Sequence, residues 1–334
     1  MSSVISGNSF LLENVYIQNC ATTVGPLEHQ GPLGAYFDQV YQDYHLGYKS
    51  YEQAEIAMLQ DAVSLVLKKS KVKKEAIDLY YGGDLNNQLA TTYYLAPFLK
   101  RPTIGLYGAC STLALAIIQA SLMIENHVIN QAISFTASHN ATAERQFRYP
   151  NEYGIQRRET MTFTGTGAVA VHLGLKPSKI KITAVTLGKV VDYMQDDPND
   201  MPRAMAPAAY DTYKQHMKDL HRQGIDYDLI LTGDLSQAGK SIFEDMLNEE
   251  HLHYKYYDDC GCLLYDKKQD VNQGGSGPVC SGLVTFGYIY QKMLAGKYHR
   301  VLLLATGALL NPVMVNQKLT IPCVCHGFVL EVAS

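Results

Sequence analysis

The chain has 334 residues, enough to bury a sizeable core in two domains or in one large domain. Its 28 basic and 32 acidic residues give a formal net charge of −4, which does not favour nucleic acid or an anionic membrane as a partner. The 7 cysteines are scattered among apolar residues without the spacing of a disulfide framework, a pattern typical of a reducing compartment.

The first half of the chain is predicted to alternate strands and helices. We expect strands over residues 9–20, 77–85, 103–107 and 132–137, and helices over residues 52–69, 89–99 and 110–126. Residues 24–48 and 137–154 are predicted to be irregular loops, because they are rich in polar residues and turn formers. A Gly-Thr turn at residues 164–167 should lead into the last strand of this half.

The second half is predicted to follow the same order. We expect strands from residue 180, over 229–234 and over 319–332, the last interrupted at Pro322 and Gly327, and helices over 211–221 and 239–248. The predicted irregular segments are a surface loop over 196–207, an approach over 254–262 and a glycine turn over 273–277.

The sequence contains an internal repeat. Shifting the chain by 170 positions places Cys280 on Cys110, with the neighbouring serine and the following apolar positions in phase. A second match relates residues 77–85 to residues 227–235, and each is predicted to be a short strand ending in Gly-Asp. We therefore predict two similar α/β halves, divided as residues 1–175 and 176–334, with a site where the two cysteine-bearing helices meet.

Cys110 opens its predicted helix, where free backbone N–H groups and the helix dipole favour an anion, either a thiolate or a bound carboxylate. The alternative is a buried cysteine that acts as a small apolar side chain. Cys280 shares the local sequence and serves as the internal comparison, and we expect it to be structural.

No membrane-spanning segment is predicted. The most apolar run, residues 301–315, is broken by Asn311-Pro312 and is too short to cross a bilayer. No charged-then-apolar signal opens the chain, so we expect no signal peptide and a protein that is cytoplasmic or peripheral to a membrane.

The duplicated α/β halves and the GACST turn at residues 108–112 resemble the thiolase superfamily, and eight stretches are more similar to one of its families, stage V sporulation protein AD. These stretches lie at residues 105–112, 136–154, 204–216, 227–236, 259–261, 274–277, 303–312 and 321–327. The resemblance implies a five-layered α/β thiolase-like fold made of two αβαβα halves. It also implies a non-condensing protein that binds dipicolinic acid (pyridine-2,6-dicarboxylate) and supports its uptake into the developing spore.

The resemblance further implies partners and a location. We expect other stage V sporulation membrane proteins as partners, a position in the cytoplasm or at the forespore or spore inner membrane, and a homodimer joined along the central strand of the first half. No nucleic-acid partner is expected.

The residues expected beside Cys110 argue against condensation chemistry. A condensing enzyme needs a thiolate, oxyanion donors, and either two imidazoles or an imidazole and an amide. Where similar synthases carry histidine and asparagine, this chain has Ser236 and Gly239, and Ser276 stands in place of a second asparagine. An acyl-transfer or condensing enzyme that uses Cys110 therefore stays an alternative, and a structural subunit without a ligand is another.

Dipicolinate is a flat dianion, so its site requires hydrogen-bond donors for the carboxylates and an apolar slot for the ring. The residues expected to form the site are Cys110, Ser138, His139, Asn140, Arg145, Arg148, Ser236, Ser276 and His326. The two arginines can bind a carboxylate, or they can pair instead with Glu144, Glu152 or a partner subunit. His139 can equally be a structural histidine.

No metal site is predicted from ligand spacing. Cys260 and Cys262, like Cys323 and Cys325, are separated by one residue, where structural zinc sites usually leave two or more. Asp84 and Asp234 end matching strands and can cap turns, or bridge a cation to the ligand. Calcium together with dipicolinate is therefore possible, although no EF-hand spacing is present, and no other cofactor is expected.

Overall fold

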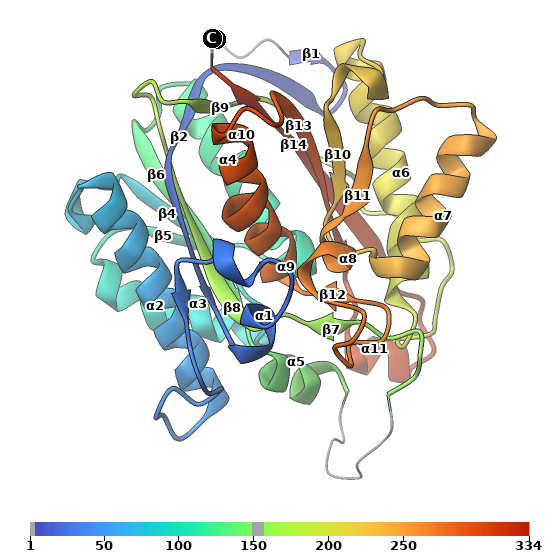
Figure 1. Cartoon of the computed structure of the whole chain (residues 1–334), viewed down its shortest axis with the longest axis horizontal. Helices are drawn as coiled ribbons and strands as arrows, with labels where there is room; N and C mark the ends of the chain where they lie inside the picture. The colour runs from blue at the N-terminus through green and yellow to red at the C-terminus, as the bar shows by residue number, and fades with distance from the viewer. Residues whose placement is uncertain (1–3, 149–156, 334) are drawn as a thin grey trace.

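The computed structural model describes residues 4–148 and 157–333 (Figure 1). The strands are β1 (Val4–Ser6), β2 (Ser9–Val24), β3 (Gln39–Val40), β4 (Leu79–Gly83), β5 (Thr103–Gly105), β6 (Gln131–Ser138), β7 (Phe163–Thr164), β8 (Gly167–Gly174), β9 (Ile180–Thr186), β10 (Leu229–Thr232), β11 (Tyr257–Asp259), β12 (Gly275–Ser276), β13 (Arg300–Ala308) and β14 (Cys323–Val332). The α-helices are α1 (Pro26–His29), α2 (Tyr51–Ser70), α3 (Ala90–Leu99), α4 (Thr112–Glu125), α5 (Asn140–Phe147), α6 (Met201–Leu220), α7 (Ser236–Glu249), α8 (Cys260–Leu264), α9 (Pro278–Gly282), α10 (Tyr290–Leu294) and α11 (Pro312–Asn316).

The two halves have matching strand orders, which run outward in opposite directions from the β2–β9 pair. The first half has the order β5-β4-β6-β8-β2, and the second continues as β9-β14-β13-β10-β11. The antiparallel pairing of β2 with β9, from Ser9 opposite Thr186 to Tyr16 opposite Lys181, joins the halves into one 12-stranded sheet that also includes β1 and β3. The short strands β7 and β12 form a separate parallel pair between the halves.

Helices cover both faces of the sheet and produce five layers (Figure 1). One apolar core lies between α2 and the first half, around Met58 and Phe135. A second lies between α6, α7 and the second half, around Phe243. The third and central core surrounds α4 and the α9–α10 helix, with Ile117 and Leu283 among its members. The repeat therefore builds two sheet halves that enclose a shared layer of helices.

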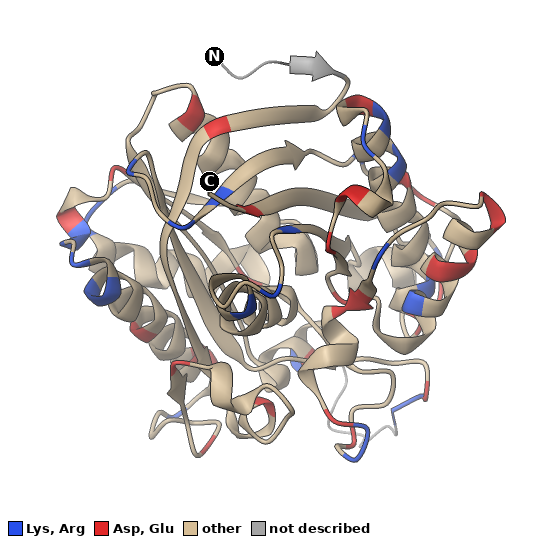
Figure 2. Cartoon of the chain, turned by 45° about the horizontal axis from the view of Figure 1, so that its top comes forward, with Lys and Arg blue, Asp and Glu red and all other residues tan. Residues whose placement is uncertain are grey.

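The helix α2 shows how the apolar pattern sets the layers. Ser50 begins the helix by accepting a hydrogen bond from the Gln53 N–H at 3.3 Å, and Lys71 ends it in a left-handed conformation. Met58, Ala62 and other residues at helical spacing on its inner face are fully buried against the sheet. Most charged residues lie on the outer helices and loops, with few on the strands (Figure 2).

Most predicted elements of the first half are confirmed, but the predicted loop over residues 137–154 is partly wrong. Residues 140–147 form the helix α5, and His139 begins it by accepting a hydrogen bond from the Ala141 N–H at 3.1 Å. Its polar composition is typical of a loop, so the sequence did not indicate a helix. Residues 149–154 of this stretch lie outside the described residues.

Three expectations for the second half are also corrected. The helix α6 begins at Met201 and includes most of the predicted loop, because Pro202 lies in the first turn, where a missing N–H leaves no bond unmade. The segment 254–262 contains the strand β11 and the start of α8. Gly327 does not interrupt β14, since it pairs with Leu304 on one side and Thr186 on the other.

The predicted division at residue 175 falls between β8 and β9 and stays a prediction, because the sheet continues across it. Among the helices of residues 4–148 and 157–333, none combines the length and the apolar character needed to cross a membrane.

Candidate functional site

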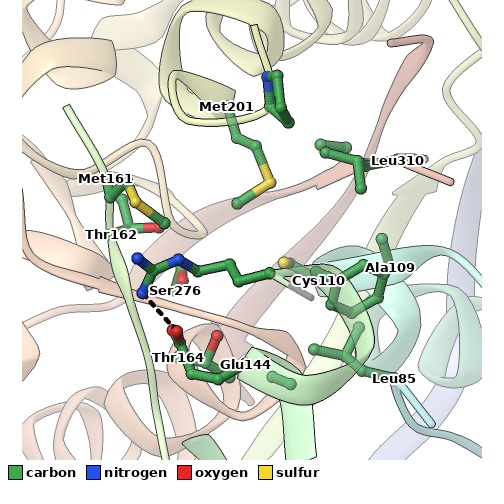
Figure 3. Close-up of a pocket in the computed structure, with 15 residues that line it drawn as sticks. Leu85, Ala109, Cys110, Glu144, Met161, Thr162, Thr164, Met201, Ser276 and Leu310 are labelled. Carbon is green, nitrogen blue, oxygen red and sulfur yellow. Dashed lines mark hydrogen bonds and ion pairs between the residues drawn. The ribbon is translucent and has the colours of Figure 1, made fainter. Parts of the chain in front are cut away.

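A narrow cavity of about 60 Å³ lies where the two halves meet (Figure 3). Its wall contains residues from both halves: Leu85, Ala109, Cys110, Ala143, Glu144, Phe147, Arg148, Met161, Thr162, Thr164, Pro198, Met201, Ser276, Ala308 and Leu310. Most of these side chains are apolar. Only Glu144 and Arg148 carry charge, so the cavity suits a ligand with an apolar body and an anionic group.

A tight turn places Cys110 on the cavity wall. The chain leaves β5, passes Gly108 and enters α4 through one 3-10 turn, Ala109–Ser111, in which Ala109 has a φ of 49°. The Thr112 hydroxyl accepts a hydrogen bond from the Gly108 N–H at 3.0 Å and donates one to the Ala109 carbonyl at 2.7 Å. Gly307 of β13 packs against this turn so closely that a Cβ there would lie 2.2 Å from the Gly108 carbonyl oxygen. The turn is therefore held from both halves.

The Cys110 thiol is paired with a buried acid. Asp234, which follows β10, lies near enough for its charge to act on the Cys110 thiol, and the Gly277 N–H opposes that effect. Burial raises the pKa of the Cys110 thiol well above its usual range, and the charge of Asp234 raises it further. Cys110 is therefore a neutral thiol at physiological pH and not a thiolate.

Asp234 is fixed by its own hydrogen bonds. The Thr306 hydroxyl donates to Oδ1 at 2.7 Å, and the Gly277 N–H donates to Oδ2 at 3.2 Å. Burial raises the pKa of Asp234 to about 6, and these donors oppose the rise. The carboxyl is therefore mostly ionised at neutral pH.

The two halves treat their matching residues differently. Cys280 is fully buried in the central core, whereas Cys110 is partly exposed on the cavity wall. Asp84, the counterpart of Asp234, accepts hydrogen bonds from the Asn86 N–H and from Thr92, and so caps the start of α3. The expected capping role is confirmed for Asp84, and a cation bridge through Asp234 stays a prediction.

Of Ser236, Ser276 and His326, only Ser276 lines the cavity. Ser236 is fully buried and donates to the Gly275 carbonyl at 2.8 Å. His326 lies on β14 outside the cavity, and its Nδ1 accepts a hydrogen bond from the Gly188 N–H at 3.2 Å. Burial lowers the pKa of His326 to about 4, so its ring is neutral. None of the described residues in the cavity wall is a histidine.

Ser138, His139 and Asn140 support the wall and do not line the cavity. Ser138 donates to the Gly165 carbonyl at 2.7 Å, and the Asn140 amide donates to the Thr164 carbonyl at 3.3 Å. His139 is buried; its Nδ1 caps α5, so Nε2 carries the proton and donates to the Tyr44 carbonyl at 3.0 Å. The interpretation of His139 as a structural histidine fits this geometry.

The two arginines predicted for the site occupy different environments. Arg145 lies on the outer face of α5, with its side chain 52% exposed, and forms an ion pair with Glu52. Arg148 lines the cavity and pairs with Glu144 at 2.5 Å. Arg157 binds the other oxygen of Glu144 at 2.7 Å, so one carboxylate faces two guanidinium groups. The proposed partner Glu152 lies outside the described residues.

A wider cavity of about 340 Å³ adjoins the first and shares Leu85, Phe147 and Leu310 with it. Much of its remaining wall is the 86–89 turn, in which Gln88 and Leu89 have φ values of 60° and 55°. Two consecutive left-handed residues with side chains are unfavourable, so other contacts must hold this turn.

The buried carboxyl of Glu55, on α2, holds both this turn and α5. It accepts hydrogen bonds from Thr91 at 3.1 Å, Asn86 at 3.0 Å and Thr142 at 2.8 Å. Burial raises the pKa of Glu55 to about 8, and the nearby charge of Asp84 adds to the rise. The turn and the helix that border the wider cavity therefore share one support.

Several cavity residues were not predicted from the sequence, including Glu144, Phe147, Met161, Thr162 and Met201. A helical interpretation of residues 140–147 would have placed Glu144, Phe147 and Arg148 on one face. No sequence signal brings Met161 and Thr162 to the site, since the pairing of β7 with β12 places them. Within the described residues, no group of three or more His, Cys, Asp and Glu side chains has the arrangement of a metal site.

A family model described as Stage V sporulation protein AD matches residues 7–331. The Stage V sporulation protein AD of Bacillus subtilis (strain 168) is 48% identical over 318 residues, which cover 95% of this chain and 94% of that protein. A crystal structure of an OleA variant from Xanthomonas campestris superposes with a TM-score of 0.61 at 15% identity, covering 97% of this chain and 99% of that one. A cerulenin-bound OleA variant gives a TM-score of 0.61 at 16% identity, with 96% and 97% covered. These similarities, together with the matching strand orders of the two halves, show a thiolase-like fold.

Proposed function

The chain belongs to the stage V sporulation protein AD family, and we propose that it binds dipicolinic acid and supports its uptake into the developing spore, without acting as an enzyme. The observation that carries this proposal is the cavity at Cys110, which combines an apolar slot with one accessible arginine, Arg148. The Cys110 thiol on its wall is protonated, which does not favour a nucleophilic role.

The lining fits the shape of the ligand. Phe147, Met161, Met201 and Leu310 offer an apolar slot for a flat ring. One ligand carboxylate would bind Arg148, whose present partner Glu144 keeps its second ion pair with Arg157. The exchange therefore leaves neither Glu144 nor that ligand carboxylate without a cation.

The charge of Asp234 sets the orientation of the ligand. An ionised carboxylate beside Cys110 repels a dianion, so both ligand carboxylates should lie away from Asp234 and towards the arginine side. Cys110 then contacts the ring as a neutral slot wall. A calcium ion bridging Asp234 and the ligand would reverse this orientation, and it is the one cation-dependent arrangement that we propose to test.

Calorimetry tests the proposal directly. Dipicolinate titrated into the full chain at neutral pH should bind at one site per chain, and the titration should be repeated with calcium. The same preparation should be incubated with an acyl-CoA and analysed by mass spectrometry for an adduct on Cys110. Absence of dipicolinate binding contradicts the proposal, and stoichiometric acylation followed by turnover supports the acyl-transfer alternative instead.

We also propose that the protein forms a two-fold dimer and contacts other stage V sporulation membrane proteins from a peripheral position. The central strand β6 cannot join two copies by strand pairing, because β4 and β8 occupy both of its edges. The free edge of the first half is β5, where Ile104 and Tyr107 are 41% and 45% exposed. Two copies of β5 can pair across a two-fold axis and cover these side chains.

Replacing Ile104 with aspartate should convert the dimer into a monomer, since it puts two like charges at the centre of the interface. Light scattering after gel filtration should give about twice 37.1 kDa for the wild type and 37.1 kDa for the variant. The matched control is Val128→Asp, at another site that is 61% exposed, and it should remain dimeric. A monomeric wild type, or a dimeric Ile104→Asp, contradicts the β5 interface.

A further inference from the structure

The hydroxyl of Thr162 lies in the cavity wall without a partner. The residue is 5% exposed, and its Oγ1 has no hydrogen bond to any described residue. Figure 3 shows Thr162 beside Met161, on the side of the cavity opposite Ala109 and Leu310. A buried hydroxyl without a partner is unfavourable, so this position favours a ligand that supplies an acceptor.

Backbone hydrogen bonds on both sides of Thr162 fix the segment that carries its side chain. The Gln273 N–H donates to the Met161 carbonyl at 3.1 Å, and the Phe163 N–H donates to the Gly274 carbonyl at 2.8 Å. Immediately afterwards β7 pairs with β12. The hydroxyl is therefore presented from a rigid segment, as recognition of one ligand atom requires.

Thr162 also lies on the arginine side of the cavity. The Arg157 guanidinium stacks on the ring of Phe163 at 4.7 Å and reaches Glu144, the residue that Arg148 pairs with. This chain of contacts connects the segment of Thr162 to the position where a ligand carboxylate would bind. In dipicolinate one ring atom separates the ring nitrogen from each carboxylate carbon. The ring nitrogen, a hydrogen-bond acceptor, therefore lies next to the carboxylate that binds Arg148.

We infer that Thr162 is the residue that selects the pyridine ring, by donating a hydrogen bond from its hydroxyl to the ring nitrogen of the bound dicarboxylate. This inference rests on the proposed function. A benzene ring in the same pose presents a C–H to Thr162 and leaves the hydroxyl unpaired, so the site discriminates between the two rings.

The test compares two ligands that differ only at that atom. Dipicolinate and benzene-1,3-dicarboxylate should be titrated into the wild type, Thr162→Val and Thr162→Ser. The wild type should prefer dipicolinate by roughly tenfold more than Thr162→Val does, because valine keeps the shape and removes the donor. Thr162→Ser should retain the preference. Thr164→Val, which alters another threonine of the same wall, is the matched control and should also retain it.

The outcomes distinguish the role of Thr162 from the proposed binding of dipicolinate. If the wild type binds dipicolinate and Thr162→Val keeps the full preference, or weakens both ligands equally, the role of Thr162 is overturned while the proposed function stands. If the wild type binds neither ligand, the proposed function fails and this inference fails with it. Thermal melting of each variant should match the wild type, and the serine variant gives a second reading if the valine variant unfolds.

Discussion

Arg148→Ala should weaken dipicolinate binding about a hundredfold in calorimetry at neutral pH. Arg148 is the cation of the cavity wall, and its guanidinium can bind both oxygens of one carboxylate. Removing it leaves that carboxylate in an apolar slot without a charged donor, a loss of about 2.7 kcal/mol, which corresponds to the stated factor. Arg148→Lys should lose about tenfold, since an ammonium keeps the charge without the planar pair of donors.

The matched control for this prediction is Arg145→Ala on the same helix. Arg145 faces outward and pairs with Glu52, so its loss should change the affinity less than threefold. Glu144 keeps its ion pair with Arg157 in the Arg148 variants, so their melting temperatures should stay close to that of the wild type. Equal effects of the two alanine variants would show that the carboxylate binds elsewhere.

Asp234→Asn should make Cys110 at least ten times more reactive towards iodoacetamide at pH 8. The substitution keeps the size of the side chain, and its carbonyl oxygen can still accept from Thr306. Burial, the largest cause of the high pKa of the Cys110 thiol, is unchanged, but the negative charge of Asp234 that raises it further is removed, while the Gly277 N–H continues to favour the thiolate. The midpoint of the rate against pH should therefore move to lower pH.

The labelling site and its accessibility need controls. Adding Cys110→Ser to the Asp234→Asn background should abolish the additional adduct, as read by peptide mass spectrometry. Wild-type Cys110 should react slowly up to pH 9, because its pKa lies well above that value. A reactivity that is unchanged or lower in Asp234→Asn would mean that Asp234 does not control the thiol, and the argument against a nucleophilic Cys110 would lose its basis.

Much of the fold could be predicted because the sequence has clear apolar spacing and an internal repeat. The apolar spacing of residues 52–69 and the repeat that relates Cys110 to Cys280 depend on local pattern alone. The helices α5 and α6 were missed or shortened because their first turns carry polar or proline residues that composition assigns to loops. Tertiary packing and a histidine cap, neither visible as a pattern, decide their structure.

The site was predictable only where one turn carries the chemistry. Cys110, Ser276 and Arg148 lie on the cavity wall as expected, but Ser138, His139, Asn140, Arg145, Ser236 and His326 do not. The three residues 138–140 lie at the edge of a strand, as expected, yet their side chains face the neighbouring turn and helix. Asp234 and Thr162 reach the site through contacts between the halves, which no single stretch of sequence encodes.

The pairing of β2 with β9 restricts how anything can enter the cavity. A clamshell motion, in which two lobes swing apart about a flexible linker, would have to break the antiparallel strand pairing that runs from Ser9 opposite Thr186 to Tyr16 opposite Lys181. The helices of the central layer pack on both halves and resist the same motion. Entry and exit must therefore use local displacement at the rim, so capture and release can be fast without any change in the overall shape of the molecule.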